Sequence, residues 1–337
     1  MGKILVTGAG GYIGSVTTNL LLENGYSVVA LDNFSRGYHA PLELLKSKYG
    51  DKLTVYETDL VYTGAKDVLD KEKDIEAVIH FAALLNVGES FKIPHKYYTN
   101  NIGGTSRLLE SLIDHGVRYF IFSSSCTVYG NAQYLPIDEK HPVVEPVSPY
   151  GFSKLTCEKI LTWYDKLDMI KPIFLRYFNV CGATDDGEIG DSKRPSFHLM
   201  QNAVRGALGI EKFELNYANV KTPDGSPIRD YVNVVDLADA HVKALAWLLR
   251  EKKGEIFNLG TGSGNSVLEI IKTVKEHTGK DFPVNMSNDR RLDEADKMVA
   301  DNKKAKEMLG WEPKRTIAQS VDSLISWYTK HPKGWER

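Results

Sequence analysis

The stretch GAGGYIG, residues 8–14, follows the apolar run ILV at residues 4–6 and precedes a helical pattern at residues 15–24. Glycines at this spacing allow a tight turn, and they let backbone N–H groups approach a pyrophosphate at the positive end of the following helix. A glycine-rich turn alone is a weak signal, because ordinary strand–helix turns also carry glycine. The strand–glycine–helix order nevertheless predicts a dinucleotide-binding loop. The predicted contacts come from Gly8, Gly11, Tyr12, Ile13 and Gly14.

Short apolar runs alternate with helical patterns through the first half of the chain. They predict strands at residues 27–31, 54–56, 77–81, 119–123 and 172–176. Such alternation indicates an α/β fold with a doubly wound parallel sheet, the Rossmann arrangement. Further strands are predicted at residues 231–235 and 255–259, with a helix at 236–250 between them.

We therefore predict two lobes. Residues 1–179 form the dinucleotide-binding domain, and residues 231–263 return to it. Residues 180–230 and 264–337 form a smaller mixed α/β lobe that binds the substrate.

Composition limits the classes of function. The 337 residues carry 42 Lys and Arg against 44 Asp and Glu, a net charge of −2 that argues against a nucleic-acid partner. No apolar run approaches the ~20 residues of a membrane span. Three scattered cysteines, and no signal-type segment ahead of the first strand, favour a reducing cytoplasm. Neither the histidines nor the acidic stretch at 185–191 has the spacing of a metal site, so no metal is expected.

Two carboxylates follow predicted strands. Asp32 ends the second strand, where it can hold an adenosine ribose diol and repel a 2′-phosphate, so NAD is favoured over NADP. Arg36 nearby is a competing signal, because a cation would tolerate that phosphate. Asp59 follows the third strand and could accept from the adenine amino group, although a solvated loop carboxylate explains it equally well.

The stretch SPYGFSK, residues 148–154, predicts the start of a helix. Ser148 is a good N-cap and Pro149 suits the first helical position, so Tyr150 and Lys154 lie one turn apart on one face. A phenol titrates near ~10 in water. We expect the ammonium, the helix end and an oxidised nicotinamide to lower this pKa, giving a base that takes a hydroxyl proton while hydride leaves the same carbon. Tyr and Lys at this spacing also occur on many ordinary helices.

The stretch FSSSCTVYG, residues 122–130, follows a predicted strand, so its hydroxyl groups should emerge at the carboxyl edge of the sheet. A serine there can hydrogen-bond the substrate oxygen that Tyr150 deprotonates. Serines are also common in turns. The coincidence of this stretch with the glycine loop and the Tyr–Lys pair is what indicates an active site.

A longer series of motifs identifies a resemblance. It includes LDNFSRG, VIHFAA, VGES, YYTNN, SSSCTVYG, LRYFNVCGA, TPDGSPIRDYVNVVDLADAH, FNLGTGSGNSVLEI and LGWEP, from Lys3 to about Trp335. The chain resembles the extended short-chain dehydrogenase/reductase superfamily, and closely the UDP-glucose 4-epimerases (UDP-galactose 4-epimerases). The resemblance implies oxidation of the sugar at C4 with bound NAD, rotation of the 4-keto sugar and re-reduction on the opposite face.

The resemblance also implies site residues. The catalytic residues would be Ser125, Tyr150 and Lys154. The additional cofactor contacts would be Asp32, Asn33, Asp59, Leu60, Phe81, Ala82, Ala83, Asn100, Ser123, Tyr150, Lys154 and Tyr177. The UDP-sugar contacts would be Ser125, Tyr150, Phe178, Asn179, His198, Leu199, Arg229, Arg291, Glu294 and Met298.

Several positions depart from the family pattern. Leu85 stands where many relatives have Lys, and Gln201 replaces a usual Pro. The carboxylate on the uridine ribose becomes Glu294, or else Asp293. Met298 stands where some relatives carry a bulky Tyr, which implies UDP-glucose and UDP-galactose as main substrates with measurable turnover of the N-acetylated pair.

The sequence also has to be compared with the requirements of related enzymes and of non-catalytic NAD-binding proteins. A UDP-N-acetylglucosamine 4-epimerase, or another UDP-sugar 4-epimerase, is the first alternative. A nucleotide-sugar dehydratase or decarboxylase needs a further acid or base after the serine stretch, where Cys126 and Thr127 stand. A non-catalytic NAD-binding regulator would usually have lost Tyr150 or Lys154. By analogy, we expect a homodimer formed through helices at about 98–115 and 150–166.

Overall fold

The computed structural model describes residues 2–62, 64–194, 196–215, 219–286 and 295–336. Its centre is a seven-stranded parallel sheet with the order β11-β6-β5-β4-β1-β2-β3. The strands are β1 (Lys3–Thr7), β2 (Ser27–Asp32), β3 (Leu53–Glu57), β4 (Ile75–His80), β5 (Tyr119–Ser123), β6 (Lys171–Tyr177) and β11 (Glu255–Leu259). The strand order reverses between β1 and β4, and doubly wound sheets bind ligands at such a point. The predicted Rossmann fold is confirmed.

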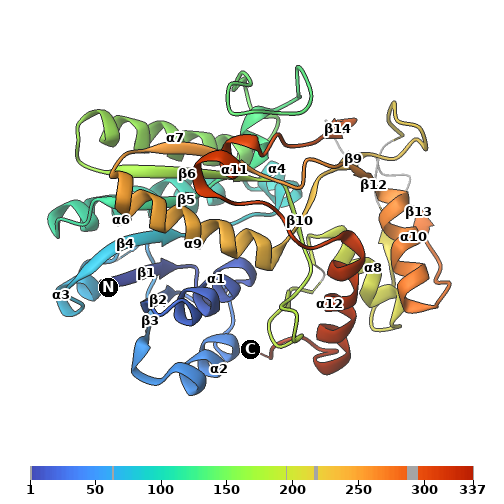
Figure 1. The fold of residues 1–337 in the computed structure, drawn as a ribbon, viewed down its shortest axis with the longest axis horizontal. Coiled ribbons are helices and arrows are strands. Elements are labelled where there is room, and N and C mark those ends of the chain that lie inside the picture. The colour runs from blue at the N-terminus through green and yellow to red at the C-terminus, as the bar shows by residue number, and fades with distance from the viewer. Residues whose placement is uncertain (1, 63, 195, 216–218, 287–294, 337) are drawn as a thin grey trace.

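Alternate side chains of the strands face opposite layers of helices, which explains why the strands read as continuous apolar runs. Ile4 and Val6 of β1 pack on one side and Leu5 packs on the other. The first layer contains α1 (Tyr12–Glu23), α2 (Ala40–Tyr49), α9 (Val234–Glu251) and α11 (Lys303–Leu309). The second layer contains α3 (Lys66–Lys71), α6 (Gly104–Asp114) and α7 (Pro149–Lys166). Figure 1 shows α1 and α9 in front of the sheet.

Short helical segments connect these elements. The segment η1 (Gly50–Lys52) precedes β3 at the amino edge of the sheet. The others follow β4 or β5 at the carboxyl edge, and they are α4 (Val87–Lys92), α5 (Pro94–Tyr97), the π-helix η2 (Tyr98–Gly103) and η3 (Cys126–Tyr129). Within the described residues, no helix is long and apolar enough to cross a membrane.

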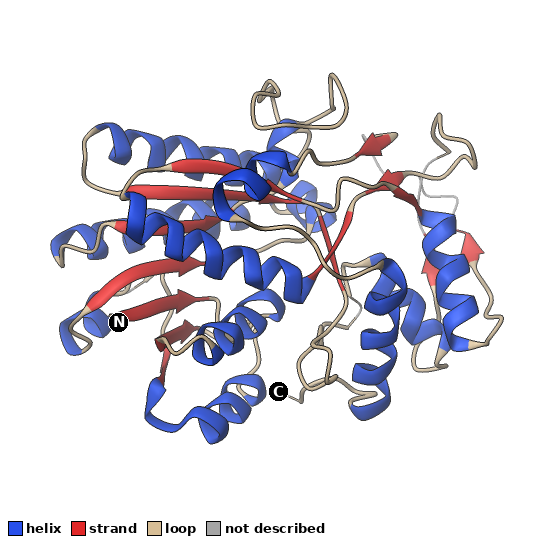
Figure 2. Ribbon diagram, in the orientation of Figure 1, coloured by secondary structure: helices blue, strands red, loops and turns tan. Residues whose placement is uncertain are grey.

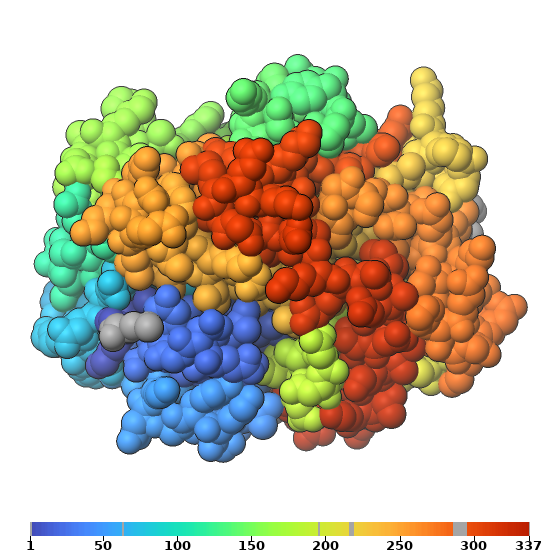
Figure 3. All heavy atoms as spheres, in the orientation of Figure 1, coloured from blue at the N-terminus to red at the C-terminus, as the bar shows by residue number. Residues whose placement is uncertain are grey.

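A smaller group of elements lies beside the sheet, at the right of Figures 1 and 2. Its core is formed by α8 (Leu199–Ala207), α10 (Val267–Thr278) and α12 (Ile317–Lys330), which pack around the fully buried Trp327. Its short strands are β8 (Glu214–Leu215), β9 (Ile228–Arg229), β12 (Asn265–Ser266), β13 (Asn285–Met286) and β14 (Lys297–Met298). In Figure 3 the C-terminal residues, coloured red, cover parts of both groups. The lobe boundaries given above remain a prediction.

The segment after residue 230 differs from the expected one. β10 (Tyr231–Asn233) is shorter than predicted, and it pairs with β7 (Asn179–Cys181) in a separate two-stranded sheet. The helix starts at Val234 because the Asn233 side chain accepts a hydrogen bond from Val235 N at 2.8 Å. β11 does join the main sheet, beside β6.

Candidate active site

The glycine loop leaves no room for side chains. Gly8 has a φ of +71°, and a Cβ there would lie 2.6 Å from Ala82 N. A Cβ on Gly14 would lie 2.2 Å from Gly8 O. The N-cap of α1 is Gly11, whose lack of a side chain leaves the first N–H groups of the helix without a side-chain cap. These are the features of an anion-binding helix start.

Asp32 stands at the carboxyl end of β2 and is 7 % exposed. Its Oδ2 accepts from Gly10 N at 2.9 Å and its Oδ1 from Phe34 N at 2.8 Å, so the carboxylate also holds the loops around it. Burial raises the pKa of Asp32, while both backbone hydrogen bonds act against that increase. Asn33 Nδ2 donates to Asp59 Oδ2 at 2.8 Å, which brings these two predicted residues together.

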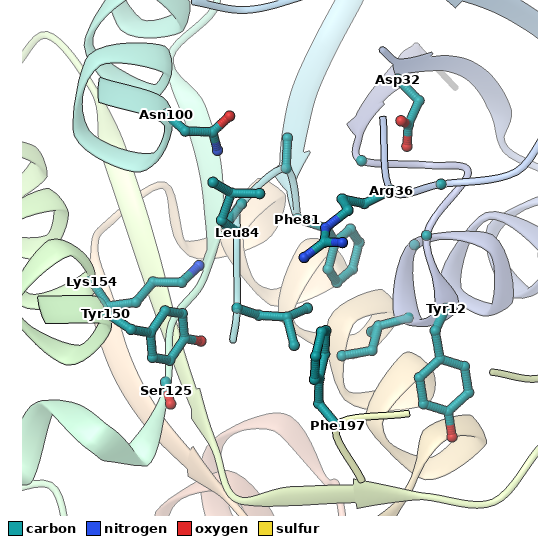
Figure 4. A pocket seen from close by; sticks show the side chains of 18 of the residues that line it. Tyr12, Asp32, Arg36, Phe81, Leu84, Asn100, Ser125, Tyr150, Lys154 and Phe197 are labelled. Atoms are coloured by element: carbon teal, nitrogen blue, oxygen red, sulfur yellow. The ribbon is translucent and has the colours of Figure 1, made fainter. Parts of the chain in front are cut away.

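One cavity of about 300 Å³ joins the glycine loop to the Tyr–Lys pair. Figure 4 shows Tyr12 and Asp32 on one side of it, with Ser125, Tyr150 and Lys154 on the other. Most of the predicted residues line it. These are Gly8, Gly11, Tyr12, Ile13, Gly14, Asp32, Asn33, Asp59, Leu60, Phe81, Ala82, Ala83, Asn100, Ser125, Tyr150, Lys154, Tyr177, Phe178, Asn179 and His198.

Helix α7 carries the pair as predicted. Ser148 is its N-cap and accepts from Gly151 N at 3.1 Å. Tyr150 and Lys154 are both buried. Lys154 Nζ donates to the backbone carbonyl of Ser123 at 2.7 Å, which fixes the ammonium against the end of β5.

The serine stretch is equally ordered. Ser125 is the N-cap of η3, and its Oγ accepts from Thr127 N at 3.3 Å and from Thr127 Oγ1 at 3.0 Å. The Ser123 hydroxyl lies 2.8 Å from Tyr177 OH. These contacts present Ser125 to the cavity from a fixed backbone.

The pKa of the Tyr150 phenol is raised in the protein by itself, and the decrease predicted with an oxidised nicotinamide bound stays a prediction. Burial raises the pKa of the phenol, and the proximity of Tyr177 adds to the increase, while a hydrogen bond with Ser125 lowers it. Burial also lowers the pKa of Lys154 to about 8. In the protein by itself, desolvation therefore favours the neutral phenol.

Residues 4–260 match the model of the NAD dependent epimerase/dehydratase family. The chain belongs to this family. It is 42 % identical over 339 residues to the UDP-glucose 4-epimerase of Lactobacillus helveticus, covering 99 % of each chain. It is also 42 % identical over 337 residues to that of Bacillus subtilis, covering 99 % of this chain and 98 % of the relative. The crystal structure of UDP-glucose 4-epimerase from Bifidobacterium longum in complex with NAD+ and UDP superposes with a TM-score of 0.94 at 37 % identity, covering 99 % of this chain and 100 % of that one.

For a member of this NAD dependent family, the residues present fit the cofactor. The glycine loop offers a cradle that a Cβ would fill, with an uncapped helix start beside it. Asp32 would supply an anion to an adenosine ribose bound beside the loop, and Tyr150 and Lys154 line the other end of the cavity. Ser123 is not among the described lining residues of the cavity, and its backbone carbonyl accepts from Lys154 Nζ.

The UDP-sugar residues are only partly brought together. Phe178, Asn179 and His198 line the cavity, whereas Leu199, Arg229 and Met298 are not among its described lining residues. Met298 is buried and belongs to the same apolar cluster as Phe178, and it pairs with Arg229 between β14 and β9. Arg291 and Glu294, like the alternative Asp293, lie outside the described residues.

Two residues of the cavity, Lys193 and Phe197, were not predicted, and they lie near Arg36, which the sequence had raised as a competing signal. Lys193 and Phe197 line it from the segment before α8, and Arg36 enters it from the loop after β2. The Arg36 guanidinium lies 5.9 Å and the Lys193 ammonium 5.8 Å from the centre of the Phe197 ring. No local pattern predicts this group, because its members come from distant parts of the chain.

Asn101 was also missed. Its Oδ1 accepts from Leu84 N at 2.8 Å, while its Nδ2 donates to Leu84 O at 3.0 Å and to Ser153 Oγ at 2.9 Å. It thereby joins the loop after β4 to α7. The YYTNN motif contains both asparagines, and Asn100, the one that the resemblance implied, lines the cavity.

Two further residues near the site, His80 and Cys126, have structural explanations. His80 is buried between two hydroxyl groups, Thr7 Oγ1 at 2.6 Å and Thr105 Oγ1 at 3.0 Å, which gives both ring nitrogens a partner. Burial raises the pKa of the Cys126 thiol to about 12, which makes it a poor nucleophile.

Proposed function

We propose that the chain is a UDP-glucose 4-epimerase, which interconverts UDP-glucose and UDP-galactose by NAD-dependent oxidation and re-reduction at C4. The observation that carries the proposal is one cavity with a dinucleotide-binding loop at one end and Ser125, Tyr150 and Lys154 at the other. Full-length similarity to UDP-glucose 4-epimerases supports the choice of sugar.

Each catalytic residue has a distinct task in this proposal. The Tyr150 phenolate oxygen takes the proton from the C4 hydroxyl, and the resulting phenol returns it when the sugar is reduced. Ser125 Oγ hydrogen-bonds the same oxygen and orients it. Lys154, fixed on the Ser123 carbonyl, supplies positive charge to this end of the cavity. When bound, the oxidised nicotinamide accepts hydride from C4, and its positive charge favours the Tyr150 phenolate that burial disfavours.

The cavity argues against a dehydratase or decarboxylase. Among its described lining residues, the carboxylates are Asp32 and Asp59, both at the adenosine end. Cys126 and Thr127 line the catalytic end, where elimination would need an additional acid or base. Reversible oxidation without elimination therefore suits the site better.

The test is to incubate the purified protein with UDP-glucose and, separately, with UDP-galactose. Each should be converted into the same mixture of the two without net consumption of NAD. UDP-N-acetylglucosamine is the comparison substrate. A protein that binds NAD but converts none of these sugars would contradict the proposal. That result would favour the alternative of a non-catalytic NAD-binding regulator.

We further propose that the protein is a cytoplasmic homodimer. Aromatic side chains are exposed on α7 and beside it, with Phe152 46 % and Trp163 63 % exposed. Tyr98 packs edge-on against Phe152 at 5.7 Å and is 37 % exposed. Such a group of apolar side chains is typical of a surface that a second copy covers. The three cysteines form no disulfide, consistent with a reducing compartment.

A further inference from the structure

A buried ion pair lies between α7 and β6, just behind the catalytic residues. The Glu158 carboxylate accepts from Arg176 Nε at 2.9 Å and from Arg176 Nη2 at 2.5 Å, the two-bond geometry of a tight guanidinium–carboxylate pair. Each residue is only 4 % exposed. Because removing two charges from water is costly, apolar residues of similar volume often stabilise a fold equally well. Stability alone therefore does not explain this pair.

The pair holds both ends of the segment that carries Ser125. Ser124 Oγ donates to Glu158 Oε1 at 2.6 Å, immediately before Ser125. At the other end of η3, Tyr129 OH accepts from Arg176 Nη1 at 3.1 Å. Both Ser124 and Tyr129 are fully buried, so the position of Ser125 depends on this polar network.

The two residues of the pair also belong to two elements that line the cavity, α7 and β6. Glu158 lies one helical turn after Lys154 on α7. Arg176 directly precedes Tyr177 at the end of β6. The network continues from Tyr129 OH, which donates to Asn258 Oδ1 of β11 at 2.7 Å.

We propose that Glu158 and Arg176 are positioning residues for the proposed epimerase reaction. They hold α7, the serine segment and the end of β6 in one arrangement, so that Ser125 Oγ and Tyr150 OH meet the same substrate oxygen. The inference rests on the proposed function. A displacement of about 1 Å at such a site can reduce the rate ~10²-fold without removing a catalytic group.

Ser124→Ala tests the link directly, because it removes one buried hydroxyl and leaves the ion pair intact. We expect kcat for UDP-glucose to fall roughly 10- to 100-fold, with KM and the affinity for UDP nearly unchanged. The matched control is Ser323→Ala in α12, where a buried serine accepts from Ala183 N at 3.0 Å and donates to Ser320 O at 2.9 Å. This control should keep the full kcat.

A double variant, Glu158→Leu with Arg176→Met, separates positioning from stability. Replacing both charges avoids an unpaired buried ion, so the protein should fold, and thermal unfolding checks this. Its kcat should fall at least as far as that of Ser124→Ala. A normal kcat in either variant would overturn the positioning role, and so would a loss of UDP affinity in Ser124→Ala as large as its loss of kcat. Absence of turnover by the unmodified protein would count against the proposed function instead.

Discussion

At the scale of single residues, Tyr150 has the clearest consequence. The substitution Tyr150→Phe keeps a buried ring of nearly the same size and removes the only atom assigned to proton transfer. We expect kcat for UDP-glucose to fall by ~10²–10⁴-fold while UDP binding stays nearly intact. Tyr97→Phe is the matched control, because Tyr97 belongs to the same buried cluster and its hydroxyl donates to Glu89 instead. Near-normal turnover by Tyr150→Phe would show that Tyr150 is not the base of the reaction.

Asp32 governs the choice of cofactor at the same scale. Its buried carboxylate would repel a 2′-phosphate, so the nucleotide released from the denatured protein should be mainly NAD(H). Arg36 also lines the cavity, and a cation there could attract that phosphate. Arg36→Ala should therefore leave the preference for NAD unchanged. Recovery of chiefly NADP(H) from the unmodified protein would show that Arg36 outweighs Asp32.

At the scale of elements, the start of α1 is the most demanding junction. Gly14→Ala should abolish tight NAD binding and lower the unfolding temperature, because the added Cβ would meet Gly8 O at 2.2 Å. Overpacking of this kind costs about 1–3 kcal/mol. Gly88→Ala in α4 is the control, since its Cβ would make an ordinary 3.5 Å contact. Calorimetric titration with NAD and thermal unfolding check both variants. If the two substitutions change the NAD affinity and the unfolding temperature equally, the glycine loop accommodates the added side chain.

Local chemistry explains which elements the sequence could predict. The glycine loop, the apolar strands and the Ser148 cap of α7 depend on neighbouring residues, so their patterns were sufficient. The separate pairing of β10 with β7 was missed, because partners about 50 residues apart leave no local pattern. The same holds for the group of Arg36, Lys193 and Phe197 in the cavity. Spacing likewise shows a neighbouring charge but not the depth of burial, which raises the pKa of Tyr150 in the protein by itself.

At the scale of the whole molecule, one residue of the glycine loop connects the two groups of elements. Tyr12 OH donates to Gly182 O just after β7, and it accepts from Gln201 Nε2 of α8 at 3.4 Å. Its ring lies 5.9 Å from that of His198. The predicted cofactor loop is thus bonded to the predicted substrate lobe. Because the loop and the lobe are bonded, one continuous cavity can receive both ligands of the proposed reaction. The substrate side of that cavity was the hardest part to predict, because it combines residues from distant parts of the chain.

The exposed aromatic face of α7 yields a prediction about assembly. If a second copy covers this face, the 37.7 kDa chain should have twice that mass in solution, as measured by light scattering. Trp163→Glu would place a charge in a desolvated contact and should produce monomers, because an unpaired charge is costly to bury. Tyr134→Glu, at a residue that is 43 % exposed on a loop outside α6 and α7, should leave the mass unchanged. If the unmodified protein has the mass of a monomer, the homodimer proposal is wrong. If the Trp163→Glu variant still has the mass of a dimer, the contact between the two copies lies on another face.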